Sequence, residues 1–127
     1  MAWYQTNIGG TLKETVLWTN PTPTAIFEKQ TVTLPDNISN YSYLKIVSRL
    51  STSNSNSGSF LIPTDEFKAE ENNMSGWGSA LKDTSIWYQR LFTKDGDTGV
   101  LISAGGRRGG TGSYNGYAIP ISIIGLK

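Results

Sequence analysis

The last eleven residues of this 127-residue chain place the strongest constraint on its fold. The segment YAIPISIIGLK, residues 117–127, is among the most apolar stretches of the sequence. An apolar terminal strand has to be covered by its own sheet or by a partner chain, because an exposed apolar edge invites aggregation. The segment before it, SAGGRRGGTGSYNG (103–116), is long and rich in glycine. This combination indicates a rigid β scaffold that presents an irregular polar loop, and such loops commonly carry binding residues.

Short segments rich in β-branched and aromatic residues recur along the chain and are typical of strands. In the clearest of them, YSYLKIVSRL, the side chains of Leu44, Ile46 and Leu50 fall on one face, and the odd positions from Tyr41 to Arg49 fall on the other. This period-two alternation predicts a strand with one buried face and one exposed or interfacial face. The remaining expected strands cover residues 14–18, 30–34, 59–63, 86–94, 98–104 and 117–127.

Turn signals separate these segments. The Asp-Gly pair within KDGD (94–97) strongly favours a hairpin, and STSNSNSGS (51–59) is a polar hairpin tip or loop. Residues 64–84 form a long connection with room for one short helix or strand. Because strands do not alternate with helices, we expect an all-β fold, an antiparallel, jelly-roll-like β-sandwich of seven to eight strands. Residues 1–127 form one domain, with residues 1–13 as a flexible or linker-like N-terminus.

The composition excludes several classes of site. The chain has no cysteine and no histidine, which removes disulfides, thiolate metal sites and every serine–histidine or cysteine–histidine pair. A net charge of +1 provides no basic field for nucleic acid or an anionic membrane. No apolar stretch approaches the ~18 residues of a membrane span, and MAWYQTNIGG lacks the pattern of a signal peptide. We therefore expect synthesis in a cytoplasm, no cofactor, no nucleic-acid partner and no membrane insertion.

Two acidic patterns suggest chemistry, and each has a simpler explanation. DGDTG (95–99) has the Asp-x-Asp-x-Gly spacing of calcium loops, but no closing glutamate follows, so a hairpin turn is favoured over a metal site. Asp65, Glu66, Glu70 and Glu71 could supply a carboxylate pair for glycoside cleavage. With ten acidic residues in 127, however, such clusters arise often by chance. We expect neither a metal site nor a catalytic residue.

The glycine-rich segment before the last strand is the best candidate for a binding site. A phosphate-binding loop would need a helix after GGRRGG, whereas the sequence continues as a strand. Arg107 and Arg108 are therefore interpreted as exposed contacts, and Tyr114 adds an aromatic face. Trp77 is flanked by glycines and is the tryptophan expected to be most exposed. We predict that Arg107, Arg108, Tyr114 and Trp77 form the ligand-binding residues for a hydroxyl-rich molecule.

Two stretches carry a resemblance to a known family. LWTNPTPTAIFEKQTVTL (17–34) resembles a stretch common in tail-fibre and adhesin proteins of bacteriophages and prophages of Gram-positive bacteria. The shared pattern is Leu-Trp-x-Asn-Pro-x-Pro-Thr, followed by Phe and by Gln-Thr-Val. The ending YNGYAIPISIIGLK (114–127) is similar to the aromatic, Ile-Pro and Gly-Leu-Lys close of the same modules. YSYLKIVSR fits between the two stretches, whereas residues 51–85 carry no resemblance.

This resemblance implies a C-terminal receptor-binding module of a phage tail, usually a homotrimer, that recognises a host cell-surface glycan without catalysis. Such a module is made in the host cytoplasm, joins other tail proteins in the virion and acts outside the cell. It normally follows a fibre shaft, whereas only sixteen residues precede the motif here, so we expect an excised domain or a small tail or capsid accessory protein. Two alternatives stay open: a structural virion protein, such as a head fibre or capsid decoration, and a small glycan hydrolase.

Overall fold

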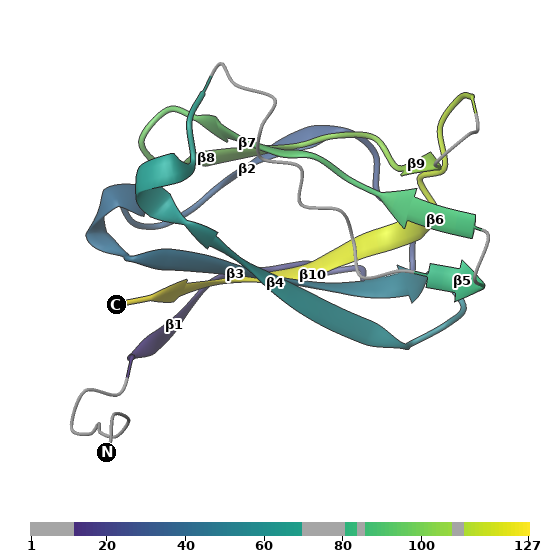
Figure 1. Cartoon of the computed structure of the whole chain (residues 1–127), viewed down its shortest axis with the longest axis horizontal. Helices are drawn as coiled ribbons and strands as arrows, with labels where there is room; N and C mark the ends of the chain where they lie inside the picture. Colours follow the sequence, from purple (N-terminus) through teal and green to yellow (C-terminus); the bar gives the residue numbers. More distant parts are fainter. Residues whose placement is uncertain (1–11, 70–80, 84–85, 108–110) are drawn as a thin grey trace.

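The described part of the chain forms a four-stranded antiparallel β-sheet that faces a second layer of strands, as the computed structural model shows (Figure 1). The structure describes residues 12–69, 81–83, 86–107 and 111–127. Strands dominate the described part, so the all-β class and the antiparallel sandwich expected from the sequence are confirmed.

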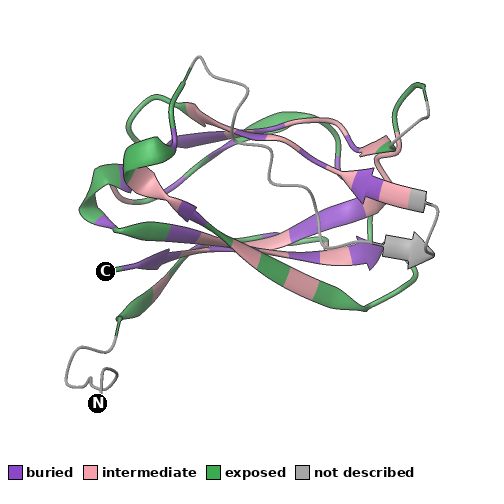
Figure 2. Cartoon of the chain, in the orientation of Figure 1, coloured by how far each residue is buried: buried purple, intermediate pink, exposed green. Residues whose placement is uncertain are grey.

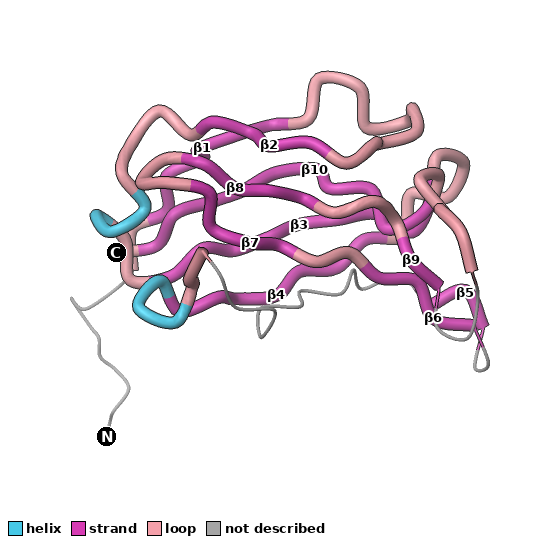
Figure 3. The backbone as a smooth tube through the Cα atoms, turned by 90° about the horizontal axis from the view of Figure 1, so that it is seen from above, coloured by secondary structure: helices cyan, strands magenta, loops and turns pink. Residues whose placement is uncertain are grey.

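The first sheet contains the longest strands. Its order is β1–β10–β3–β4, and every neighbouring pair is antiparallel. Seen from above, β10 runs between β1 and β3, and β4 forms the far edge (Figure 3). The four strands are β1 (Glu14–Thr19), β10 (Tyr117–Leu126), β3 (Tyr43–Ser51) and β4 (Ser57–Pro63).

The second layer is built from shorter strands in two groups. One group has the order β2–β8–β7 and the other has the order β5–β6–β9, again with antiparallel pairs. Figure 1 shows β6 and β9 continuing the layer of β7 and β8 toward one end of the sandwich. The strands are β2 (Gln30–Thr33), β5 (Leu81–Asp83), β6 (Ile86–Gln89), β7 (Phe92–Asp95), β8 (Gly99–Ile102) and β9 (Gly106–Arg107).

The ten strands of the described part correspond to eight longer ones. Only Arg90 and Leu91 separate β6 from β7, and only residues 103–105 separate β8 from β9. Joining each interrupted pair gives eight strands, within the seven to eight that the sequence predicts. Between the interrupted strands the Leu91 amide donates to the Ser103 hydroxyl at 2.8 Å and not to a backbone carbonyl.

The main core lies between the inner faces of the two layers. The even positions of β3 that were expected inside, Leu44 and Ile46, are fully buried, and the alternation of buried and half-buried residues is visible along β3 (Figure 2). Each layer contributes aliphatic side chains, and Phe60 meets Phe92 edge-on at 5.6 Å between ring centroids. The fully buried members of the core are Ile38, Leu44, Ile46, Ile62, Phe67, Phe92, Val100, Ile102, Ile119 and Ile123.

The terminal strand is covered by its own sheet. β10 pairs with β1 on one side and β3 on the other, and the side chains of Ile119 and Ile123 are inaccessible to solvent. The pairing extends past β1, because the backbones of Lys13 and Lys127 exchange hydrogen bonds of 2.9 and 3.2 Å. Lys13 is thus held to the end of β10 although β1 begins only at Glu14. Residues 1–11, on which most of the expected flexible N-terminus (1–13) falls, lie outside the described part.

Tyr41 departs from the face that the sequence alternation assigned to it. The strand begins only at Tyr43, because the one-turn 3-10 helix η2 (Ile38–Asn40) precedes it and turns Tyr41 into the core, where it is 7 % exposed. Gly125 makes this possible: a Cβ there would lie 2.5 Å from the Tyr41 ring. A second 3-10 turn, η3 (Thr64–Glu66), occupies the connection where a short helix was expected.

The strand order differs from that of a jelly roll, in which most consecutive strands lie in opposite sheets. β3 and β4 form a hairpin, and so do β7 and β8, whose turn pairs Asp95 with Gly99 and holds Gly96 at φ 77°. Connections this short keep both strands in one sheet, because crossing to the other sheet requires about 10 Å. The hairpins expected at STSNSNSGS and at KDGD are thus confirmed, and they account for the departure from jelly-roll order.

The pH dependence of stability follows from Asp36. The Tyr41 hydroxyl, the Asn37 amide and the Asn40 side chain all donate to its carboxylate and hold the pKa of Asp36 below its ordinary value. Such a carboxyl stabilises the fold above its unfolded pKa of about 3.9, and this stabilisation is lost as the pH falls through the folded pKa. We expect a thermal midpoint that is flat from about pH 6 to 8, since no histidine titrates there, and that falls below about pH 4. In Asp36→Asn the thermal midpoint should fall less steeply at acidic pH. A thermal midpoint of the parent that drifts by several degrees between about pH 6 and pH 8 would contradict this account.

Candidate functional site

The glycine-rich segment that follows β8 is closed at its base by backbone contacts. The Tyr114 amide donates to the Gly105 carbonyl oxygen at 2.9 Å, and the Gly105 amide donates to Oδ1 of Asn115 at 2.9 Å. Gly105 has to be glycine, because a Cβ there would lie 2.1 Å from the Tyr114 carbonyl oxygen. The two ends of the loop are therefore held together before the chain enters β10.

Arg90 anchors this base from the interior of the sandwich. Its side chain is fully buried. The guanidinium donates to four backbone carbonyl oxygens: Nη1 to Ser103 at 2.9 Å, Nη2 to Asn115 at 3.0 Å and Tyr117 at 3.1 Å, and Nε to Ala118 at 2.9 Å. These carbonyls come from both ends of the loop. One side chain thus ties β6–β7 to the chain that leaves β8 and to the chain that enters β10.

The Arg90 charge is balanced by carbonyl dipoles and an aromatic face. Burial lowers the pKa of Arg90 to about 10, so it is cationic at neutral pH. Its Cζ lies 5.3 Å from the centre of the Phe27 ring, a cation–π distance. Ala118, which accepts the Nε bond, has a φ of 50°. A left-handed alanine costs roughly 1–2 kcal/mol, and the bond from Arg90 helps to hold it there.

Three tyrosines form a second, smaller core next to this anchor. The rings of Tyr88 and Tyr117 stack with centroids 3.9 Å apart and planes 5° apart, and Tyr114 leans on Tyr88 at 6.0 Å. Leu50 and Ala118 complete the cluster. Burial, followed by the hydrogen bond to Tyr117, raises the pKa of Tyr88, so this phenol stays neutral. Tyr114 and Tyr117 are half-buried and keep part of their surface in solvent.

Arg107 lies over this cluster from the short strand β9. It pairs with Tyr88 across β6 and β9, and its Cζ is 6.0 Å from the centre of the Tyr114 ring. Arg107 is exposed, and the described part of the chain offers it no acidic partner, because the only ion pair there joins Lys45 to Glu14. We call Arg107 and Tyr114, with Tyr88 and Tyr117 beneath them, the loop-end patch.

Two of the four ligand-binding residues predicted from sequence are thus together in space. Arg107 and Tyr114 lie in contact at the loop-end patch. Arg108 and Trp77 lie outside the described residues. The adjacent Trp87 and Tyr88 were expected to face opposite ways, and Tyr88 is buried whereas Trp87 is half-buried. The patch offers a ring face beside a planar cation, a combination that stacks on sugar rings and donates to hydroxyl groups.

Sequence reasoning missed Arg90, and it considered Tyr88 and Tyr117 as stacking aromatics without including them among the ligand-binding residues. The signal for Arg90 was the alternation of Tyr88, Arg90 and Phe92, which puts an arginine on the same strand face as two aromatic residues. A charged residue at a core position is buried only when its donors are satisfied. That position therefore indicated a buried guanidinium, although its carbonyl partners could not be read from the pattern.

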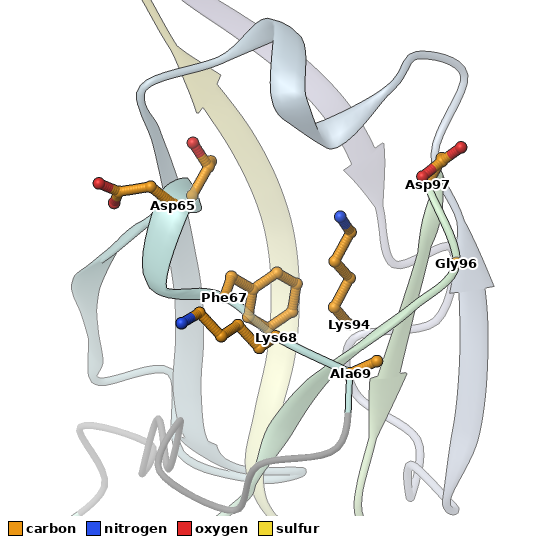
Figure 4. Close-up of a pocket in the computed structure, with 8 residues that line it drawn as sticks. Asp65, Phe67, Lys68, Ala69, Lys94, Gly96 and Asp97 are labelled. Carbon is orange, nitrogen blue, oxygen red and sulfur yellow. The ribbon is translucent and has the colours of Figure 1, made fainter.

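A hollow lies at the end of the sandwich opposite the loop-end patch. It has a volume of about 530 Å³ and is bordered by η3 and by the β7–β8 hairpin (Figure 4). The Phe67 ring lies between Lys68 and Lys94 in this view, with Asp65 and Asp97 farther out. Within the described residues no three acidic side chains gather as metal ligands. We call this region the hairpin-end hollow; it carries two charges of each sign.

Comparisons with known proteins add no family assignment. No protein-family model matches the chain, and no curated protein sequence matches it. The described residues also contain no helix with the length and apolarity to cross a membrane.

Replacing Arg90 should destabilise the fold strongly. In Arg90→Met the hydrophobic volume is kept, but one buried and three part-buried carbonyl oxygens lose their donor, and we expect a loss of about 3–5 kcal/mol in the free energy of unfolding. Arg49→Met is the matched control, because Arg49 is half-buried and donates to two carbonyl oxygens of one turn, Ser51 at 2.8 Å and Thr52 at 3.4 Å; we expect a loss of about 1 kcal/mol or less. Urea unfolding at neutral pH measures both, and equal losses would contradict the anchoring role of Arg90.

Proposed function

We propose that this domain is a non-catalytic receptor-binding module of a bacteriophage tail that attaches the virion to a glycan on the host cell surface. The observation that carries the proposal is the contact of Arg107 with Tyr114, 6.0 Å from Cζ to the ring centre, on a loop base that is already closed. The location in a phage tail rests on the resemblance of residues 17–34 and 114–127 to tail-fibre modules.

The loop-end patch suits a saccharide for two reasons. A half-exposed tyrosine offers an apolar ring face that can stack on the C–H face of a pyranose, and the guanidinium beside it offers several donors to hydroxyl groups. The patch is also pre-organised. The backbone amide of Tyr114 donates a hydrogen bond to the Gly105 carbonyl oxygen, and the Tyr114 ring contacts Tyr88. Ordering a long glycine-rich loop at the moment of binding would cost affinity, and a fixed base avoids part of that cost.

A structural role in the virion is the second candidate, and one observation favours it. The outer face of the first sheet exposes 62 % of Val16 and 53 % of Leu61, which lie in one cross-strand row with Ile124 and Lys45 between them. Tyr43 adds 36 % exposure on the same face. An apolar band of this kind is typical of an interface, and it is the surface through which the proposed homotrimer would assemble.

Retention on purified cell walls from a panel of Gram-positive bacteria tests the proposal. We expect Arg107→Ala and Tyr114→Ala to weaken retention about tenfold, because each removes a contact worth on the order of 1 kcal/mol. Tyr114→Phe keeps the ring and should retain most of the binding. The matched control, Arg49→Ala, removes the same residue type elsewhere and should bind like the parent.

Light scattering on the same samples separates the two candidates. Under the receptor-binding proposal, the variants at Arg107 and Tyr114 keep the oligomer mass of the parent, whereas their retention on cell walls is weaker. If the parent binds no wall in the panel and Tyr43→Ala lowers the mass of an oligomer, the domain serves assembly instead. If the variants at Arg107 and Tyr114 bind every wall like the parent, the loop-end patch is not the receptor site.

A further inference from the structure

Besides the hairpin-end hollow, the structure has a hollow at the loop end, on the opposite side of β6 from the loop-end patch. It encloses about 390 Å³, within the usual range for small-ligand sites. Its wall combines three glycines with a few larger side chains. The lining residues are Lys29, Gln89, Leu91, Ser103, Ala104, Gly105, Gly106 and Gly112, and we call this the outer-face hollow.

Strand alternation places this hollow on the outer surface of the second layer. Tyr88, Arg90 and Phe92 are buried, so Gln89 and Leu91 point the other way, and both are half-buried. An amide and an aliphatic side chain thus follow one another along the wall of the outer-face hollow.

Bare backbone forms the other wall. Gly106 pairs with Gln89 across β6 and β9, and a Cβ at Gly106 would meet the Gln89 Cγ at 3.5 Å, an ordinary contact distance. The fold therefore does not require glycine at position 106, in contrast to Gly105. A glycine that packing does not demand leaves the backbone open to close approach by a ligand. Gly112, whose φ is 89° with open space around it, extends this wall.

The charge of the hollow has one sign. Among the described lining residues Lys29 alone is charged. It is exposed, and no described residue forms an ion pair with it. The hairpin-end hollow, by contrast, combines Lys68 and Lys94 with Asp65 and Asp97. An unopposed ammonium group beside an amide favours a polar ligand that carries a negative group.

We propose that the outer-face hollow is a second saccharide site, specific for a sugar unit that bears a carboxylate or a phosphate. In this site Lys29 pairs with the acidic substituent, Gln89 donates to and accepts from ring hydroxyls, and the 105–106 backbone lets the sugar approach closely. The proposal extends the proposed function, on which it rests for the glycan nature of the ligand, but it uses none of the residues of the loop-end patch.

Titration of the ¹⁵N-labelled domain with D-glucuronate, glucose 6-phosphate and glucose tests this site. We expect the amide signals of Gln89, Ser103 and Gly106 to shift with at least one acidic sugar. The affinity for that sugar should be at least about fivefold higher than the affinity for glucose. The two acidic sugars separate the carboxylate source from the phosphate source. Equal response to glucose, or no response of these amides to either acidic sugar, overturns the proposal.

Two variants and a control make the test specific. Lys29→Gln should lower the affinity for the acidic sugar about fivefold and leave glucose unaffected, whereas Lys68→Gln removes an equal charge at the opposite end and should change nothing. Gly106→Leu should block the hollow without unfolding the domain, because its Cβ meets no close contact. If Lys29→Gln and Lys68→Gln have the same affinity for the acidic sugar, or if Gly106→Leu binds it like the parent, the proposal of a saccharide site in the outer-face hollow is wrong.

The outcome is distinguishable from that of the proposed function. Shifts confined to Arg107 and Tyr114 would contradict the outer-face hollow while leaving the loop-end patch in place. Shifts at Gln89 and Gly106, combined with wall binding that survives Arg107→Ala and Tyr114→Ala, would leave the hollow standing and move the receptor site to it.

Discussion

A buried guanidinium is stable only where its nitrogen atoms meet acceptors, and each of the three side-chain nitrogens of Arg90 donates to a backbone carbonyl. The carbonyls of Ser103, Asn115, Tyr117 and Ala118 reach it only when the chain after β8 and the chain before β10 arrive at the same point. Removing the charge from water costs several kcal/mol in isolation. The fold offsets that cost with hydrogen bonds, and those bonds fix the path of the loop ends.

The two candidate binding surfaces both depend on this arrangement. On the inner side of β6, Tyr88 stacks on Tyr117 and supports Tyr114 beneath Arg107. On the outer side, Gln89 and the 105–106 backbone border a hollow. Because residues 103–105 accept and donate bonds at the anchor, the same constraint shapes both faces. A β-sandwich places its adaptable segments at its ends, and here one end is stiffened at its base.

Local pattern was enough to predict the strands but not their partners. The alternation at Leu44 and Ile46 and the turn at Asp95-Gly96 predicted a strand and a hairpin, since both depend on neighbours in sequence. Tyr41 was placed on the wrong face because the 3-10 turn before it and the space above Gly125 depend on distant contacts. Arg107 and Tyr114 were chosen by residue type, and their contact required β9, a two-residue strand with no sequence signal. The closure of the loop base by Gly105 could not be foreseen either.

Native-state hydrogen exchange at the Tyr114 amide is the most direct test of the claim that the loop base is part of the rigid scaffold. The account predicts that this amide, bonded to the Gly105 carbonyl at 2.9 Å, opens with a free energy within about 2 kcal/mol of the Ile123 amide in the central strand. In Arg90→Met its protection should fall by more than that of Ile123. Exchange of the Tyr114 amide near the rate of an unstructured peptide, with Ile123 fully protected, would contradict the account.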